Sequence, residues 1–317
     1  KNGIYSLEMK VNGKRYFYHD VATFSFPESK YINLHIDYPH YGQFKKKFQK
    51  TFKVNSNKLS TYKDLVNNGK LKVENGFTYK IEIIAKDFKG NTSIIRTSVI
   101  GKESNPIFSK IKDTTQYKIT KEKFAKFIQK NITIAFPKNT FYNNYFLDFK
   151  VDSSHVKIHT PTIPLDKKFT LTFNTSHLSE KEKKVMYIAN INNKRYPRYL
   201  KTNKKKDKFY TTTKLLGKYT LLSDTEKPII KLVNFKNKQW VTKLKHLKVK
   251  IKDNHSGINS YKATIDGQWV LMEYNHKRGI LSYNLKDKLL LSSKHKFEII
   301  VSDNVGNTNT LSATFYR

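Results

Sequence analysis

Histidine is the main side chain that could bind a transition metal in this chain of 317 residues, which contains ten histidines and no cysteine. His155 and His159 stand four residues apart, a spacing that would pair them on one face of a helix. Val156, Ile158 and the Thr-Pro-Thr that follows favour a strand instead, on which residues four apart are separated by about 13 Å. We therefore expect no metal site at this pair.

Two other histidine groups also lack a zinc pattern. His35 and His40 have no recognised ligand spacing, and we expect them to help seat a helix. His255 begins His-Ser-Gly-Ile-Asn, which nearly spells the His-x-Gly-x-Asp zinc motif of lysostaphin-type peptidases. Asn259 stands where the ligand aspartate would be, and no His-x-His follows, so we expect no zinc here either.

Oxygen ligands for Ca²⁺ could come from Asp303, Asn304 and Asn307, but too few carboxylates lie together to predict a calcium site. Asp303, Gly306 and Asn307 form Asp-x-x-Gly-Asn, which is turn chemistry. Glycine accepts a positive φ without a Cβ clash, and Asp or Asn side chains bind the nearby backbone. We predict a structural turn.

The same turn occurs twice. The segment Tyr79–Ser93 aligns with His295–Asn309 at an offset of 216 residues, which places Asp87, Gly90 and Asn91 at the matching turn positions. Apolar residues at every second position precede both turns and predict a strand with one inward face. We expect a strand, a tight turn and a return strand in each copy, closing two similar domains.

A second match lies upstream, where Asn2–Gly13 aligns with Ser256–Gly267 at an offset of 254 residues. The two offsets differ by 38, which predicts an insertion between Gly13 and Tyr79. The later copy is preceded by Leu247–Lys252, whose alternation is typical of a strand, and the first copy has no counterpart. We therefore expect the chain to be a fragment whose first domain is completed by residues upstream of Lys1 or by a neighbouring chain.

The insertion, at about 29–70, is predicted to be helical. Phe44, Phe48 and Phe52 recur at i, i+4 and i+8, the spacing of one helical face, within the segment Ser29–Val54. We expect this stripe to pack against the first domain.

The fold class that we predict is mainly β, with three consecutive Ig-like β-sandwich domains at 1–101, 102–222 and 223–317. Lys102–Lys112 has no sustained period and is predicted to be a linker. Ser179 is a good N-cap and could start one or two helical turns. Seven strands are predicted in the middle domain, which we expect to have a different β fold: 132–136, 145–151, 156–159, 169–173, 185–191, 208–213 and 217–222.

Composition excludes several protein classes. Hydrophobic residues at 38% and aromatic residues at 14% exclude a disordered chain despite a formal charge of +36. Only six of the 61 basic residues are arginine, the residue whose bidentate fork nucleic-acid readers use, so we do not expect nucleic acid as a partner. No apolar run approaches the roughly 18 residues of a membrane span. No nucleophile elbow and no phosphate-binding loop is present.

Several segments resemble one family across essentially the whole chain. They are Tyr31–Tyr38, Asn57–Lys63, Tyr187–Asn190, Leu216–Leu222 and Asp224–Pro228. They resemble the non-catalytic C-terminal region of lysostaphin-like (family twenty-three) zinc metallopeptidases of the Gram-negative envelope. The resemblance implies a catalytic zinc domain before Lys1, with none of its zinc ligands in this chain. It also implies a periplasmic or outer-membrane-associated location.

The leading hypothesis is a non-enzymatic accessory region of a peptidoglycan metalloendopeptidase. It would position the zinc domain or dock it to an envelope protein or to peptidoglycan, and it would bind no cofactor itself. The alternative is a free-standing adhesin or glycan-binding array. A third reading, a polyanion binder, rests on net charge alone.

Overall fold

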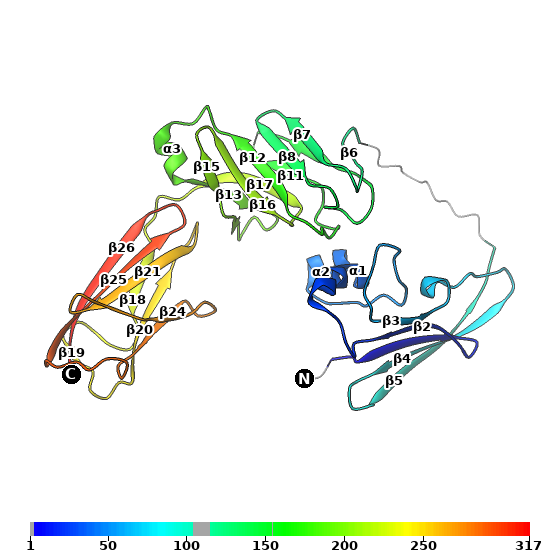
Figure 1. The fold of residues 1–317 in the computed structure, drawn as a ribbon, viewed down its shortest axis with the longest axis horizontal. Helices are drawn as coiled ribbons and strands as arrows, with labels where there is room; N and C mark the ends of the chain where they lie inside the picture. The colour runs from blue at the N-terminus through cyan, green and yellow to red at the C-terminus, as the bar shows by residue number, and fades with distance from the viewer. Residues whose placement is uncertain (1–2, 104–114, 154) are drawn as a thin grey trace.

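The structure is a computed structural model that describes residues 3–103, 115–153 and 155–317, and these residues form six β-sheets and a few short helices (Figure 1). We call β1–β5 the first unit, β6–β17 the middle unit and β18–β26 the last unit. The chain is mainly β, as predicted, and its middle and last units are each built from two packed β-sheets. In the part of the chain that the structure describes, every helix is too short or too polar to cross a bilayer.

The last unit is a two-layer β-sandwich. Its strands are β18 Ile229–Leu232, β19 Gln239–Trp240, β20 His246–Lys252, β21 Ile258–Ile265, β22 Gln268–Val270, β23 Glu273–Asn275, β24 Ile280–Asn284, β25 Lys294–Asp303 and β26 Thr308–Tyr316. One sheet has the order β18-β20-β24-β23 and the other β19-β26-β25-β21-β22. Side chains alternate between buried and exposed along β20, so the predicted strand Leu247–Lys252 is confirmed.

The middle unit is also a sandwich. Its elements are β6 Lys118–Ile119, β7 Ala125–Gln129, β8 Ile132–Phe136, β9 Tyr145–Phe146, β10 Phe149–Val151, β11 Val156–Ile158, β12 Phe169–Asn174, α3 Glu180–Val185, β13 Met186–Asn190, β14 Arg198–Tyr199, β15 Asn203–Lys205, β16 Lys208–Thr213 and β17 Gly217–Ser223. The sheets β10-β11-β17-β13-β14 and β15-β16-β12-β8-β7 enclose one apolar core. Strands occur at all seven predicted places. Ser179 caps α3 in a capping box with Glu182, which confirms the predicted helical turns.

The first unit has a single β-sheet, without a second sheet among the described residues. Its elements are β1 Ser6–Val11, β2 Lys14–Asp20, η1 Phe26–Tyr31, α1 Ile32–His35, α2 Tyr38–Phe44, β3 Tyr62–Leu65, η2 Asn67–Gly69, β4 Thr78–Lys86 and β5 Thr92–Ile100. The sheet order is β3-β2-β1-β4-β5. The insertion covers the β1–β3 part of one face, where Leu7, Met9 and Phe17 form a small core.

The helical insertion is present, but the prediction that Phe44, Phe48 and Phe52 line one helix is wrong. The helix α2 ends at Phe44, and Lys45 takes a left-handed φ of 59°. Beyond it the chain turns back, so that the Asp37 amide donates to the Phe48 oxygen at 2.9 Å. Backbone pairing with the preceding segment therefore replaces the helical continuation that the spacing allowed.

Both copies of the repeated hairpin have the predicted strand, turn and return strand. Ile83 pairs with Ile95 in the first unit, as Ile299 pairs with Leu311 in the last unit. The upstream match is also structural, since β1 and β21 both end in a two-residue turn with positive φ values. The predicted linker lies outside the described residues from 104 onward.

Candidate functional site

The histidines that could have formed metal pairs are separated by the fold. The predicted strand is present as β11, but it ends at Ile158, so that His155 and His159 flank it and take different neighbours. His155 lies 3.1 Å from the Asp152 carboxylate, and the His159 ring accepts a hydrogen bond from the Asp148 amide at 3.2 Å. His255 is half exposed and lies 3.3 Å from Glu226.

His35 seats the insertion on the sheet. Its ring stacks on that of His19, from β2, with centroids 4.4 Å apart, and its Nδ1 lies 2.9 Å from the Tyr62 hydroxyl. Burial, followed by the neighbouring His19, lowers the pKa of His35 to about 4. His40 packs within the insertion against Phe44 and Phe48.

The two Asp-x-x-Gly-Asn turns share one geometry. In each, the aspartate accepts hydrogen bonds from following backbone amides and from the asparagine side chain, at 2.7 Å for both Asp87–Asn91 and Asp303–Asn307. Gly90 and Gly306 have φ values of +86° and +101°. The turn of the first unit is exposed, whereas Asp303 is buried.

Asp303 lies beside two aspartates that the sequence patterns did not single out. Carboxylate oxygens of Asp224, Asp253 and Asp303 lie within 4.8 Å of one another, and Asp224 and Asp303 are each only 1% exposed. Asp224 follows β17, Asp253 follows β20 and Asp303 ends β25. Three strand ends thus meet where the middle and last units join. Their positions directly after apolar strands were the signal available in the sequence.

The cluster brings three acidic side chains together. Burial, and then the charges of Asp224 and Asp303, raise the pKa of Asp253. No lysine, arginine or histidine among the described residues forms an ion pair with these three carboxylates. Among residues 3–103, 115–153 and 155–317, these three aspartates are the group of potential ligands whose oxygen atoms lie close enough together to hold a metal ion.

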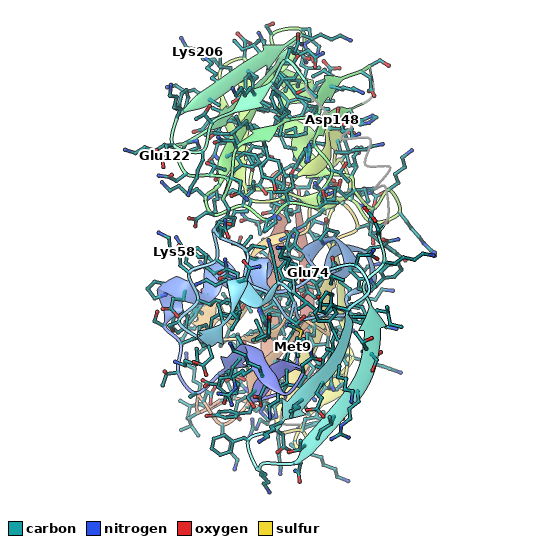
Figure 2. All side chains as sticks on the ribbon, turned by 90° about the vertical axis from the view of Figure 1, so that its right-hand side faces the viewer. Met9, Lys58, Glu74, Glu122, Asp148 and Lys206 are labelled. Carbon is teal, nitrogen blue, oxygen red and sulfur yellow. The ribbon has the colours of Figure 1, made fainter. Side chains whose placement is uncertain are left out.

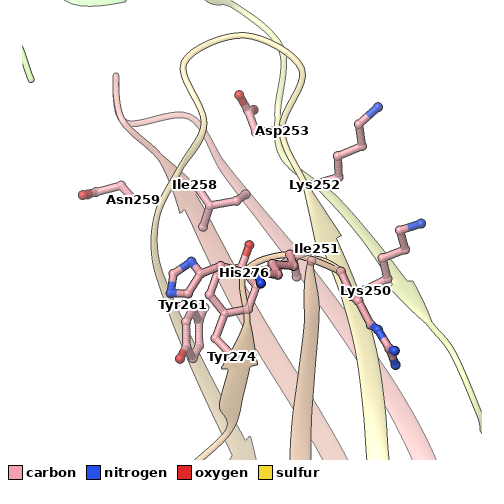
Figure 3. A pocket seen from close by; sticks show the side chains of 12 residues that line it. Lys250, Ile251, Lys252, Asp253, Ile258, Asn259, Tyr261, Tyr274 and His276 are labelled. Carbon is pink, nitrogen blue, oxygen red and sulfur yellow. The ribbon is translucent and has the colours of Figure 1, made fainter. Parts of the chain in front are cut away.

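A shallow pocket of about 560 Å³ opens beside the cluster, and Asp253 lines it (Figure 3). Tyr261, Tyr274 and His276 contribute rings to its wall. The Tyr274 and His276 ring centroids are 4.2 Å apart, and those of Tyr261 and Tyr274 are 5.7 Å apart. Figure 3 shows Lys250 projecting on the opposite side from these rings. The pocket therefore combines aromatic faces with hydrogen-bonding and cationic groups.

The first and middle units also touch through specific side chains. The Lys30 ammonium lies 2.9 Å from the Asp166 carboxylate, and the Tyr142 hydroxyl donates to the Lys30 oxygen at 3.0 Å. Burial raises the pKa of Tyr142, so this hydroxyl remains a donor. In Figure 2, Lys58 of the first unit and Glu122 of the middle unit lie on facing sides of the boundary between these two units.

The first sheet leaves the β4–β5 half of its insertion-facing side open. Every residue of β5 is exposed, including Ile95 at 64% and Val99 at 37%, and Phe77 before β4 is 60% exposed. Ile81 and Ile83 of β4 are half-buried. We call Phe77, Ile81, Ile83, Ile95 and Val99 the open face.

Comparisons with known proteins match one part of the chain to a family. Residues 116–224, about a third of the chain, match the model of the Zu5-like domain. No curated protein matches the chain.

Three solved structures resemble the chain at 10% sequence identity. The fibronectin(III)-like modules of Clostridium thermocellum CbhA give a TM-score of 0.24, covering 47% of this chain and 85% of theirs. Bacteroides ovatus SGBP-B of the mixed-linkage glucan utilisation locus, in complex with a mixed-linkage heptasaccharide, gives 0.18, covering 98% of this chain and 60% of its own. A SusE-like surface located polysaccharide binding protein from the Bacteroides thetaiotaomicron heparin utilisation locus gives 0.18, covering 100% and 49%. This chain thus spans less than two thirds of the last two. TM-scores this low carry no argument about a ligand.

Proposed function

We propose that the chain is a non-catalytic array of Ig-like units that holds an attached or docked protein at a fixed position in the bacterial cell envelope. The observation that carries this proposal is the presence of side-chain contacts at both junctions. Lys30 and Tyr142 join the first and middle units, and Asp224 joins the middle and last units through Asn307. An array with such junctions can set the distance and the angle at which the attached protein is held.

The finer part of the proposal is that the positioned protein is a zinc peptidoglycan endopeptidase. Its support is the resemblance of segments such as Tyr31–Tyr38 and Leu216–Leu222, since the comparisons contain no peptidase. The zinc would belong to that enzyme, because the resemblance implies a zinc domain whose ligands lie outside this chain.

Solution scattering tests the positioning role. We expect the wild-type chain to scatter as one defined shape, and the double substitution Lys30→Ala, Tyr142→Phe to broaden its distribution of dimensions. Lys126→Ala, at an exposed site on β7, is the matched control and should leave the curve unchanged. A wild-type chain that already samples many shapes would contradict a positioning role.

The peptidase link requires the native protein. Antibodies against this chain should isolate a polypeptide that contains stoichiometric zinc and releases muropeptides from purified sacculi, with the release abolished by a chelator. The purified 317-residue chain should release none. Native material without zinc and without this activity would overturn the link and favour the alternative below.

The second candidate is a glycan-binding array, and the pocket of Tyr261, Tyr274 and His276 is the observation that favours it. Sugar rings stack on aromatic faces, and lysine and arginine side chains can bind their hydroxyl or acidic groups. Titration calorimetry with soluble peptidoglycan fragments and mixed-linkage glucan tests it. Binding that Tyr274→Ala abolishes, and Trp240→Ala at another exposed aromatic site preserves, would support this function.

A further inference from the structure

We infer that the open face of the first unit is a docking surface for a pair of antiparallel strands from another polypeptide, with apolar residues at every second position. This inference goes beyond the positioning role and stands without it. The argument comes from the internal repeat, because the last unit contains the same hairpin with its face covered.

Equivalent positions differ sharply in burial between the two units. Phe297 and Ile299 in β25 are fully buried, whereas their counterparts Ile81 and Ile83 in β4 are only half-buried. Phe315 in β26 is fully buried, whereas its counterpart Val99 is exposed. The backbone pairing is the same in both hairpins, so the register does not cause the difference.

The missing cover can be identified in the last unit. There β18 lies against β26, and Ile230 and Leu232 of β18 pack on the core that contains Phe315. β18 pairs with β20, whose Leu247, Val249 and Ile251 are almost completely buried. In the first unit the insertion covers β1–β3, and no element within the described residues takes the place of β18 and β20 over β5.

The chemistry of the occupant follows from the apolar pattern of the open face and from the net charge of the chain. A layer that fits must present alternating apolar side chains, because the open face alternates in the same way. The chain carries a formal charge of +36, so a second copy would bring two strongly basic molecules together. We therefore commit to a different polypeptide with a net negative charge.

Thiol labelling tests the inference cleanly, because the chain contains no cysteine. Ile95→Cys places a thiol on the open face, and Ile94→Cys places the matched control on the opposite face of the same strand. The probe is a copy of residues 226–253 fused through a flexible linker ahead of Gly3, with the outward Lys248, Lys250 and Lys252 of that copy changed to glutamate. We expect the fusion to slow maleimide labelling of the Ile95→Cys variant by about tenfold or more and to leave the Ile94→Cys variant unchanged.

A second fusion serves as the control for effects of the added segment that do not depend on its pattern of apolar residues. In it, each apolar residue of the added β20 copy exchanges places with its following neighbour, which keeps the composition and shifts the alternation by one residue. Protection by the first fusion but not by the second supports the inference. Equal labelling with both fusions, or equal protection by both, overturns it. Protection of the unfused chain on raising its concentration, with a dimer in sedimentation, overturns it in favour of a second copy.

Discussion

The side-chain amide of Asn307 donates to the backbone oxygen of Asp224 at 3.0 Å and to the Asp303 carboxylate at 2.7 Å. One residue of a β-turn thereby holds the end of the preceding unit. The equivalent Asn91 binds Asp87 at 2.7 Å, but its turn is exposed and has no neighbouring unit attached.

This difference predicts unequal effects of one substitution at two matched sites. Asn307→Ala should destabilise the last unit by about 1–3 kcal/mol, because it leaves buried acceptors on Asp224 and Asp303 unpaired. Asn91→Ala should cost about 0.5 kcal/mol or less, since water replaces the lost donor. Chemical denaturation of both variants provides the measurement, and equal losses would refute the role given to the junction.

The two turn glycines should respond alike to a β-branched residue. Gly306→Val and Gly90→Val should each destabilise their unit by about 1–3 kcal/mol, because valine is strained at positive φ. A new Cβ at either site would meet no atom within 4 Å, so backbone strain alone is tested. Lys296→Ala, at an exposed position on β25, should stay within about 0.5 kcal/mol of the parent in the same denaturation series. A harmless Gly306→Val would show that the turn tolerates other conformations.

The aspartate cluster predicts that removing a negative charge stabilises the last unit. Because the pKa of Asp253 is raised on folding, the folded state binds its proton more tightly than the unfolded state, and stability falls as pH rises above the unfolded value of about 4. Asp253→Asn keeps the acceptor oxygen for the His255 and Gly257 amides and should raise the unfolding midpoint at pH 7. Thermal unfolding from pH 4 to pH 8, in chelator, gives the result. Destabilisation by Asp253→Asn under these conditions would contradict the predicted repulsion between Asp253 and its two neighbouring aspartates.

Acid should weaken the first unit through His35. Its folded pKa of about 4 lies below the unfolded value of about 6.5, so the unfolded state binds more protons between these values and stability falls as pH is lowered through that window. The loss from this residue should be about 3 kcal/mol, and burial of His19 adds to the same slope. His35→Gln should flatten the dependence, whereas His255→Gln, at an exposed site, should not. Denaturation at pH 4, 5 and 6.5 makes the comparison.

Local patterns in the sequence were sufficient to predict most of the strands and the repeated hairpin. The alternation before Asp303 and Asp87, and the glycine three residues later, depend only on neighbouring residues and the pleat. The Phe44, Phe48 and Phe52 spacing misled because a chain that reverses after a short helix can carry the same spacing. Backbone pairing with Asp37 decided between the two structures.

The candidate site was beyond such patterns because distant strand ends assemble it. Asp224 reads as part of a domain boundary and Asp253 as the polar residue after a strand. Only the packing of the middle unit on the last unit brings both to Asp303. The open face is non-local in the same sense, since its exposure depends on the absence of a covering layer.

The position of β5 as an edge strand of its sheet also has a consequence for aggregation. One side of its backbone has no strand partner within the described residues, and its exposed β-branched residues can template pairing with another chain. Arg96 is the charged residue within this nine-residue strand, where it can act as a gatekeeper against stacking. Fibre formation during expression should therefore begin at this edge, and neutralising Arg96 should accelerate it.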